Sequence, residues 1–285
     1  MDPVDAAPPS IFEIFSAQGV LRRTLPSYEY RAGQLDMALA VERALNEERT
    51  LLCEAGTGTG KTLAYLVPAI LSGKKVIVST ATRALQEQIV QNDLPLIEQA
   101  LGLPVHAAVM KGLGNYLCLR RYQQARMSSA QGDLGSLRKL VMVENWAQRT
   151  HSGDLTELGE LAEGDAILTR VASSSDTRIG SSCAHHEDCF VTRMKREAAA
   201  ASLVIVNHHL FFADLALRGP HPGRVLPDYE AVIFDEAHHL EDIATQFFSV
   251  RVSSSKLEAL VRDAENAFPA LPQRQAALAV VGGVR

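Results

Sequence analysis

Two short stretches of this sequence carry residues whose types and spacing could act on a phosphorylated nucleotide. The first is a glycine-rich turn that ends in a lysine and a threonine, and it consists of Ala55, Gly56, Thr57, Gly58, Thr59, Gly60, Lys61 and Thr62. Its glycines allow a tight backbone turn in which successive N–H groups point inward at an anion. Lys61 would reach the β- and γ-phosphates of a nucleoside triphosphate, and the Thr62 hydroxyl would hold Mg²⁺. One residue departs from the strict motif, because Ala55 stands where a glycine is usual.

The second stretch places adjacent carboxylates directly after an apolar run. Residues 231–234 are Ala-Val-Ile-Phe, and Asp235 and Glu236 follow them. In phosphate-loop enzymes a carboxylate at the end of a strand completes the Mg²⁺ shell, and a neighbouring carboxylate can orient and deprotonate the attacking water. We therefore assign Asp235 to the metal ion and Glu236 to the base. Such a pair alone is more often a solvated turn, but in combination with the glycine-rich turn it is specific.

Composition limits the class of protein without identifying a substrate. The chain has 285 residues, 47% of them hydrophobic, which suits one large domain or two smaller ones. Its net charge is −5, so contact with nucleic acid would need a local groove and not an overall basic surface. The sequence has no apolar run of membrane-spanning length, and its N-terminus lacks the basic flank of a signal peptide. We expect a cytoplasmic protein that does not contact a membrane.

The hydrophobic pattern predicts the scaffold that must position these groups. Short apolar runs predict strands at 51–53, 76–79, 203–206 and 231–234. Stretches of helical period predict helices at about 34–46, 63–71, 240–248 and 256–268. The alternation of strand and helix favours a parallel sheet with sites at the carboxyl ends of its strands. Thr80 and Arg83 follow one such strand and could donate to phosphates, although an ordinary capped helix explains them as well.

The pattern loosens between about residues 104 and 201, which indicates an insertion. This region contains three of the four cysteines, Cys118, Cys183 and Cys189. Four cysteines are too few for a disulfide scaffold in a chain of this length, and in a reducing compartment they suggest packing or metal binding. Cys183 and Cys189 also bracket His185 and His186, and such mixed sulfur and nitrogen ligands could hold zinc.

Six motifs occur in order along the chain: Arg31-Ala32-Gly33-Gln34, the glycine-rich turn, Ser79 to Gln86, Gly114 to Cys118, Asn207 to Phe211, and Asp235 to His238. Together they closely resemble the DinG/YoaA group of bacterial iron-sulfur DNA helicases, which is related to XPD within helicase superfamily two. The resemblance covers nearly the whole chain, to about Val252. It implies an ATP-dependent DNA helicase that moves 5′ to 3′ on single strands during DNA repair or replication.

The resemblance also implies a domain organisation. A RecA-like first motor domain, with the α/β fold of P-loop NTPases, would consist of residues 1–104 and 202–245. An inserted iron-sulfur domain would occupy 105–201, and a helical arch domain would begin within 246–285. The implied site residues are Gln34 beside the glycine-rich turn for ATP, His238 for coupling the nucleotide to DNA, and Thr80, Arg83 and Asn207 for single-stranded DNA. Gln34 could offer its amide to a base edge, but a solvated glutamine at a helix start is equally common.

The metal site departs from the family pattern. Helicases of this group carry four cysteines that hold a 4Fe–4S cluster, and alignment on Cys118, Cys183 and Cys189 places the fourth at Arg178. Cys53 is not a substitute, because we expect it to be buried on the strand that leads into the glycine-rich turn. A complete Cys₄ site is therefore not encoded. A cluster with Asp176, His185 or His186 as the fourth ligand, a zinc ion, or loss of the metal remain as alternatives.

The length of the chain is a second departure. The family motor places ATP between two RecA-like domains, and the second domain supplies an arginine worth ~10³ to 10⁵ in rate. This sequence stops before that domain, so the resemblance implies ATP binding with slow hydrolysis. Two interpretations follow: the N-terminal part of an ATP-hydrolysing DNA helicase, or a truncated non-catalytic module that binds nucleotide and DNA. Turnover of ATP distinguishes them.

Overall fold

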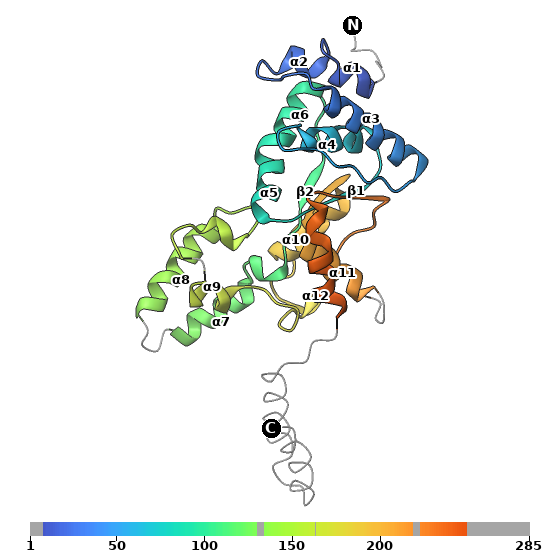
Figure 1. Cartoon of the computed structure of the whole chain (residues 1–285). Helices are drawn as coiled ribbons and strands as arrows, with labels where there is room; N and C mark the ends of the chain where they lie inside the picture. The colour runs from blue at the N-terminus through green and yellow to red at the C-terminus, as the bar shows by residue number, and fades with distance from the viewer. Residues whose placement is uncertain (1–7, 130–133, 163, 219–222, 250–285) are drawn as a thin grey trace, which may run out of the picture. The chain divides into compact units, whose positions relative to one another are not determined.

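The computed structural model describes residues 8–129, 134–162, 164–218 and 223–249 (Figure 1). The chain divides into two compact units, Met1–Ile243 and Ala244–Arg285, and the second is described only as far as residue 249. The predicted helix at 256–268 and nearly all of the predicted arch domain therefore lie outside the described residues.

A parallel sheet of four strands forms the centre of the first unit. The strands are β1 (Val76–Thr80), β2 (Ala107–Val109), β3 (Leu203–Asn207) and β4 (Ala231–Phe234), and their order across the sheet is β2-β3-β1-β4. In register, Thr80 lies opposite Asn207 and Ser79 opposite Phe234, so the carboxyl ends of β1, β3 and β4 share one edge. The predicted α/β class with a RecA-like parallel sheet is confirmed.

Helices cover both faces of this sheet. Alternate residues of β1 and β3 enter two separate hydrophobic clusters: Ile77 and Val204 pack with the helices of the insertion, while Val78 and Ile205 pack with the N-terminal helices. Burial on both faces explains why these strands are continuous apolar runs. The N-terminal helices are α1 (Ile11–Phe15), α2 (Val20–Thr24), α3 (Ala32–Glu47), α4 (Lys61–Leu71), α5 (Arg83–Gln88), a π-helical turn (Ile89–Asp93) and α6 (Leu94–Leu101).

The predicted strand at 51–53 is wrong. No strand forms there in the described structure, and Leu52 is 93% exposed while Cys53 is also exposed. The expected burial of Cys53 is therefore wrong as well. A strand exists only where a neighbour completes its hydrogen bonds, and a run of three apolar residues carries too little pattern to specify that pairing.

Within the predicted insertion, residues 105–201, β2 at 107–109 pairs with β3 and is part of the sheet. Two isolated antiparallel bridges, Tyr116 with Asp154 and Leu117 with Ala172, tie the following segments together. The helices of the predicted insertion are α7 (Leu119–Ser129), α8 (Leu134–Ala147), α9 (Ala166–Val171) and α10 (Phe190–Ala200). Three short 3₁₀ turns lie at Leu113–Asn115, Leu155–Glu157 and Gly180–Ser182. After β3 come α11 (His208–Leu217), a 3₁₀ turn (Ala237–His239) and α12 (Leu240–Phe248).

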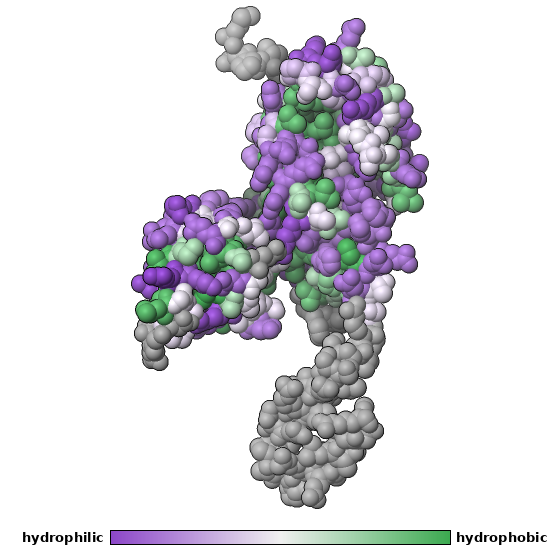
Figure 2. Space-filling view, turned by 60° about the vertical axis from the view of Figure 1, so that its left-hand side comes forward, coloured by the Kyte–Doolittle hydropathy of each residue, from purple (hydrophilic) through white to green (hydrophobic). Residues whose placement is uncertain are grey.

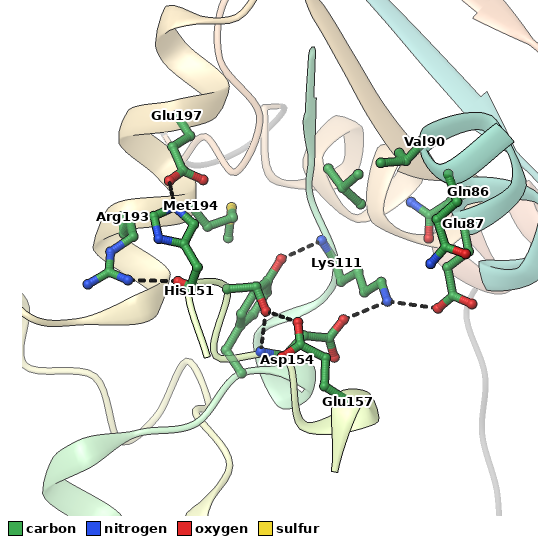
Figure 3. Close-up of a pocket in the computed structure, with 14 residues that line it drawn as sticks. Gln86, Glu87, Val90, Lys111, His151, Asp154, Glu157, Arg193, Met194 and Glu197 are labelled. Carbon is green, nitrogen blue, oxygen red and sulfur yellow. Dashed lines mark hydrogen bonds and ion pairs between the residues drawn. The ribbon is translucent and has the colours of Figure 1, made fainter. Parts of the chain in front are cut away.

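A buried ion pair joins the insertion to the sheet (Figure 3). Lys111 follows β2, its side chain is 8% exposed, and its Nζ atom lies 2.6 Å from Asp154 Oδ2 and 3.2 Å from Glu87 Oε1. Glu87 belongs to α5, whereas Asp154 belongs to the insertion. A pocket of about 250 Å³ opens beside this pair, lined also by His151, Arg193 and Glu197. Lys111 thus links α5 to the segment that contains Asp154.

The surface of the insertion mixes polar and apolar side chains. Figure 2 shows apolar patches between polar residues on this part of the molecule. Met127, Leu134 and Val141 on α7 and α8 are more than half exposed. Across the described residues, no helix is both long and apolar enough to cross a membrane.

Candidate nucleotide site

The glycine-rich turn connects the end of α3 to the first residue of α4. Gly58 and Gly60 have φ angles of +79° and +78°, a region that residues with a side chain rarely adopt. Gly60 is the N-cap of α4, and Lys61 is its first residue. The turn therefore presents the N-terminus of an eleven-residue helix to whatever lies on it, which is the arrangement that binds phosphate.

Three side chains from the α3 region brace this turn. Gln34 is 2% exposed, and its Nε2 atom donates to the Gly60 carbonyl at 2.9 Å. Its Oε1 atom accepts from the Tyr28 hydroxyl at 2.8 Å. Arg31 donates to the Gly58 carbonyl at 2.5 Å. The Gln34 amide thus helps to hold the turn in shape. The sequence analysis did not predict this bracing role for Gln34, Tyr28 or Arg31.

The two predicted carboxylates lie next to the turn. Lys61 Nζ is 3.3 Å from Glu236 Oε1, and the Tyr65 hydroxyl donates to Asp235 Oδ2 at 3.3 Å. The backbone holds Asp235 in place, since its N–H donates to the Ser79 carbonyl at 2.8 Å. The structure therefore brings Lys61, Asp235 and Glu236 together across 175 residues of sequence, as their assigned roles require.

Negative charge dominates this cluster. Burial and the charge of Glu236 raise the pKa of Asp235. Burial and the charge of Asp235 raise the pKa of Asp93 to about 6. Of these carboxyl groups, that of Glu236 lies 3.3 Å from the Lys61 ammonium. Carboxylate and hydroxyl oxygens are the ligands that Mg²⁺ prefers, and Asp235 and Thr62 are the residues predicted to offer them.

Sequence reasoning missed Tyr65 and Asp93. Tyr65 is almost fully buried, and burial followed by the charge of Asp235 raises its pKa well above the ordinary value. It lies four residues after Lys61 on α4, and that helical spacing was the available signal. Asp93 ends the π-helical turn, a rare element that frequently marks functional sites and that no sequence pattern announces.

His238 lies at the edge of the cluster. Its Nδ1 atom is 3.4 Å from Glu236 Oε2, and its side chain is 66% exposed. The ring lies against that of His239, with centroids 4.1 Å apart and ring planes tilted by 42°. Glu236 itself has a φ of +54°, an uncommon conformation for a residue with a side chain. His238 therefore contacts the proposed base from the solvent side.

The three residues predicted for DNA share the edge of the sheet at the ends of β1 and β3. Thr80 is fully buried, and its hydroxyl donates to the Thr82 carbonyl at 3.2 Å. Asn207 caps α11, because its Oδ1 atom accepts from the Leu210 N–H at 2.8 Å. Arg83 is exposed at the start of α5. Thr80 and Asn207 thus shape the edge, and Arg83 presents a cation on it.

The residues of the predicted metal centre do not fit a four-thiolate cluster. Arg178, at the position of the fourth cysteine, donates to Cys189 Sγ at 3.6 Å. Burial alone would raise the pKa of Cys189, but hydrogen bonds from Thr192 and the Val191 N–H, with the Arg178 charge, lower it below its ordinary value. The position expected for the fourth thiolate is therefore occupied by the guanidinium group of Arg178, which binds the sulfur of another expected ligand, Cys189.

The alternative ligands point elsewhere. The His185 ring bonds Gln123 Oε1 at 3.0 Å, the His186 ring bonds the Gly180 carbonyl at 3.2 Å, and Asp176 accepts from Ser175 at 3.0 Å. The described part of the chain contains no group of three or more His, Cys, Asp or Glu side chains placed to hold a metal ion. The structure thus does not assemble Cys118, Cys183 and Cys189 into a ligand set.

Comparison with known proteins agrees with the nucleotide site. Residues 36–143 match the family model of the DEAD/DEAH box helicases. The chain is 43% identical over 253 residues to the ATP-dependent DNA helicase YoaA of Haemophilus influenzae, which covers 89% of this chain and 40% of that protein.

Two further relatives extend the comparison. The chain is 39% identical to the ATP-dependent DNA helicase YoaA of Escherichia coli over 249 residues, 87% of this chain and 39% of the relative. It is 36% identical to the ATP-dependent helicase DinG of Mycobacterium tuberculosis over 251 residues, 80% of this chain and 37% of the relative. The chain thus spans about two fifths of the length of these proteins. With its lysine turn and strand-end carboxylates in one site, the chain contains a match to the DEAD/DEAH box helicase domain and is a homologue of the YoaA and DinG helicases.

Proposed function

We propose that this chain is the ATP-binding part of a DNA helicase motor, in which ATP hydrolysis drives 5′ to 3′ movement along single-stranded DNA. The observation that carries the proposal is the 3.3 Å contact between Lys61 Nζ and Glu236 Oε1. It places the cation that would bind phosphate beside the carboxylate that would activate water. The YoaA relatives, which are ATP-dependent DNA helicases by name, support the assignment of DNA as the second ligand.

The residues of the site suggest how a nucleotide is handled. A triphosphate on the turn competes with Glu236 for the Lys61 ammonium, because one cation cannot pair fully with both. Once Lys61 moves to the phosphates, Glu236 is free to accept a proton from water. Thr62 and Asp235 would hold Mg²⁺, which would supply positive charge to offset the phosphates. ATP binding would thus break the Lys61–Glu236 ion pair and leave Glu236 available as the base.

Single-stranded DNA would lie along the edge formed by the ends of β1 and β3. Arg83 and the N-terminus of α5 would offer positive charge to the DNA phosphates. Thr80 and Asn207 would shape the protein backbone at this edge. Binding through phosphates is sensitive to salt and insensitive to base sequence. The net charge of −5 confines this contact to a local surface.

ATP hydrolysis by the 285-residue chain tests the proposal, measured with and without single-stranded DNA and with Lys61→Ala as the blank. We expect turnover above the blank, and an increase when DNA is added. Bound ATP with turnover equal to the blank would favour a non-catalytic module that binds nucleotide and DNA. Failure to bind ATP at all would contradict both.

A further inference from the structure

A buried histidine lies where the nucleotide and DNA parts of the proposed site meet. His208 is the first residue of α11, and its side chain is completely buried. Its Nδ1 atom is 2.7 Å from the Ser79 hydroxyl. Its Nε2 atom is also buried and has no hydrogen-bond partner among the described residues. In either neutral tautomer, therefore, one polar ring atom of His208 is left unsatisfied, which is unfavourable.

Ser79 joins this histidine to the strand that carries the carboxylates. It lies on β1, opposite Phe234 of β4 on one side and Val206 of β3 on the other. Its carbonyl accepts the Asp235 N–H at 2.8 Å, while its hydroxyl bonds His208. One residue thus holds Asp235 through its backbone and His208 through its side chain.

The free side of the ring faces the carboxylate segment. Burial lowers the pKa of His208 to about 4, and hydrogen bonding to the backbone of Asp235 and then of Glu236 opposes that effect. The His208 and Phe234 rings have centroids 6.0 Å apart, so His208 lies beside the end of the strand that leads into Asp235, although Nε2 has no hydrogen-bond partner among the described residues. Glu236 has the uncommon φ of +54°, so a small rearrangement of this segment would change which groups reach Nε2.

The same two residues also begin the segments proposed for DNA. Ser79 directly precedes Thr80 and the start of α5, where Arg83 lies, and His208 directly follows Asn207. A shift of the Ser79 to His208 hydrogen bond would move both segments together, since Thr80 and Asn207 are paired in register.

We propose that His208 is a positioning residue that couples nucleotide binding to single-stranded DNA binding through its hydrogen bond to Ser79. The inference rests on the proposed function, because it assigns a means of communication between the two ligands of that function. Nucleotide that draws Lys61 from Glu236 shifts the 235–236 segment, the shift alters the partners of Nε2 and Ser79, and the edge that carries Arg83 responds. Such coupling is reciprocal, so DNA must change nucleotide affinity by the same factor.

The test measures binding and needs no turnover. The dissociation constant of the 285-residue chain for a fluorescent oligo(dT) is measured at fixed salt, with and without a non-hydrolysable ATP analogue and Mg²⁺. The ratio of the two constants reports the coupling. We expect a ratio of about five or more for the unmodified chain, typical of coupled sites. The variants are Ser79→Ala, His208→Asn, which retains a group at the Nδ1 position, and His208→Gln, which reaches only toward Nε2.

Ser79→Ala and His208→Gln, which lose the Ser79 to His208 hydrogen bond, and His208→Asn, which keeps that bond but lacks Nε2, should each reduce the ratio to less than about two. The control His209→Asn, at the exposed neighbouring residue, should retain it. The dissociation constant for each ligand alone should change little, which separates coupling from general damage to either site. Retained coupling in Ser79→Ala overturns the inference, and this variant decides alone if His208→Gln does not fold. Binding of both ligands with a ratio of one also overturns it, while binding of neither ligand overturns the proposed function itself.

Discussion

Lys61 and Glu236 neutralise each other, and that pairing has a cost for nucleotide binding. Both side chains are about one third exposed, so the pair is partly screened by water and contributes modestly to stability. Its main effect is competition, since the ammonium that a phosphate needs is already engaged. Burial and then the charge of Glu236 raise the pKa of Asp235, so this carboxyl group holds a proton more strongly than an exposed aspartate does.

Glu236→Gln should therefore bind ATP as tightly as the unmodified chain or a few-fold more tightly, because a neutral amide competes less for Lys61. Hydrolysis should fall by about 10² to 10⁴, the usual contribution of a general base. Binding is measured by titration with a fluorescent ATP analogue and turnover by phosphate release, with Lys61→Ala as the control that loses both. Hydrolysis at the unmodified rate would show that Glu236 is not the base.

Asp93→Asn addresses the pH dependence of stability. The pKa of Asp93 is raised from 3.8 to about 6 in the folded chain, so the folded state holds this proton more strongly than the unfolded state does. The stabilisation is complete below about pH 4 and is lost as pH rises through 6. At pH 7.5 the variant should melt roughly 2 to 4 °C higher, and at pH 4.5 the gain should be about a third as large. An equal gain at both pH values would mean that charge is not the cause.

The residues of the nucleotide site could be predicted from the sequence where their motif lies within a few neighbouring positions. Glycines followed by Gly60-Lys61-Thr62, and adjacent carboxylates after an apolar run, each indicate their chemistry within a few positions. Gln34, Tyr65 and Asp93 were missed or given another role because their partners lie far away in sequence, as when Tyr65 meets Asp235 170 residues later. Contacts between residues so far apart in the sequence depend on how the sheet is assembled, and no short sequence pattern predicts them.

At the scale of elements, the phosphate turn is held by α3 and not by a strand. Gln34 and Arg31, at the start of α3, bond the carbonyls of Gly60 and Gly58. The turn's shape therefore depends on contacts between two helices that pack closely together. The strand predicted at 51–53 was wrong for the reason that strands depend on neighbours, whereas helices α3 and α4 form their own hydrogen bonds and were placed correctly from their pattern.

Gly60→Ala tests this arrangement. A Cβ at this position would lie 2.2 Å from Gln34 Nε2, and the φ of +78° disfavours any side chain. We expect ATP affinity to fall about tenfold or more, equivalent to about 1.4 kcal/mol. The matched control is Gly33→Ala on α3, where an added Cβ meets nothing within 4 Å and helix formation should be slightly favoured. Equal losses of ATP affinity in the two variants would contradict the bracing role.

Across the whole molecule, the insertion and the sheet are joined at Lys111. Its ammonium is shared by Asp154 of the insertion and Glu87 of α5, as Figure 3 shows. Removing one partner of a buried pair leaves an uncompensated charge. No sequence pattern predicts this link, because Lys111 and Asp154 belong to no motif and are brought together only by the fold.

Lys111→Met should lower the free energy of unfolding by about 3 kcal/mol or more, measured by urea titration. Adding Asp154→Asn to it should recover part of the loss, since the buried carboxylate is then no longer charged. Glu87→Gln serves as the comparison, because Glu87 is half exposed and its pair should contribute under about 1 kcal/mol. A double variant no more stable than Lys111→Met alone would argue against a buried ion pair.

The insertion should also lack a stable four-thiolate cluster. After anaerobic reconstitution we expect the unmodified chain to hold far fewer than the ~4 irons of a 4Fe–4S cluster, because Arg178 occupies the fourth position. Arg178→Cys should gain iron and acid-labile sulfide, measured per chain together with an absorbance spectrum, and Arg178→Ala should not. Equal, equally stable iron content in the unmodified chain and Arg178→Cys would show that Arg178 does not exclude the cluster.

The order of strands in the sheet also governs when the nucleotide site can form during synthesis. β1 must wait for β3 and β4, and the entire insertion is translated between β1 and β3. The glycine-rich turn therefore emerges early and meets its carboxylates only after residue 236 has left the ribosome. Sheets built from such distant segments fold slowly. The nucleotide site is therefore completed late in synthesis, although its lysine, Lys61, is translated early.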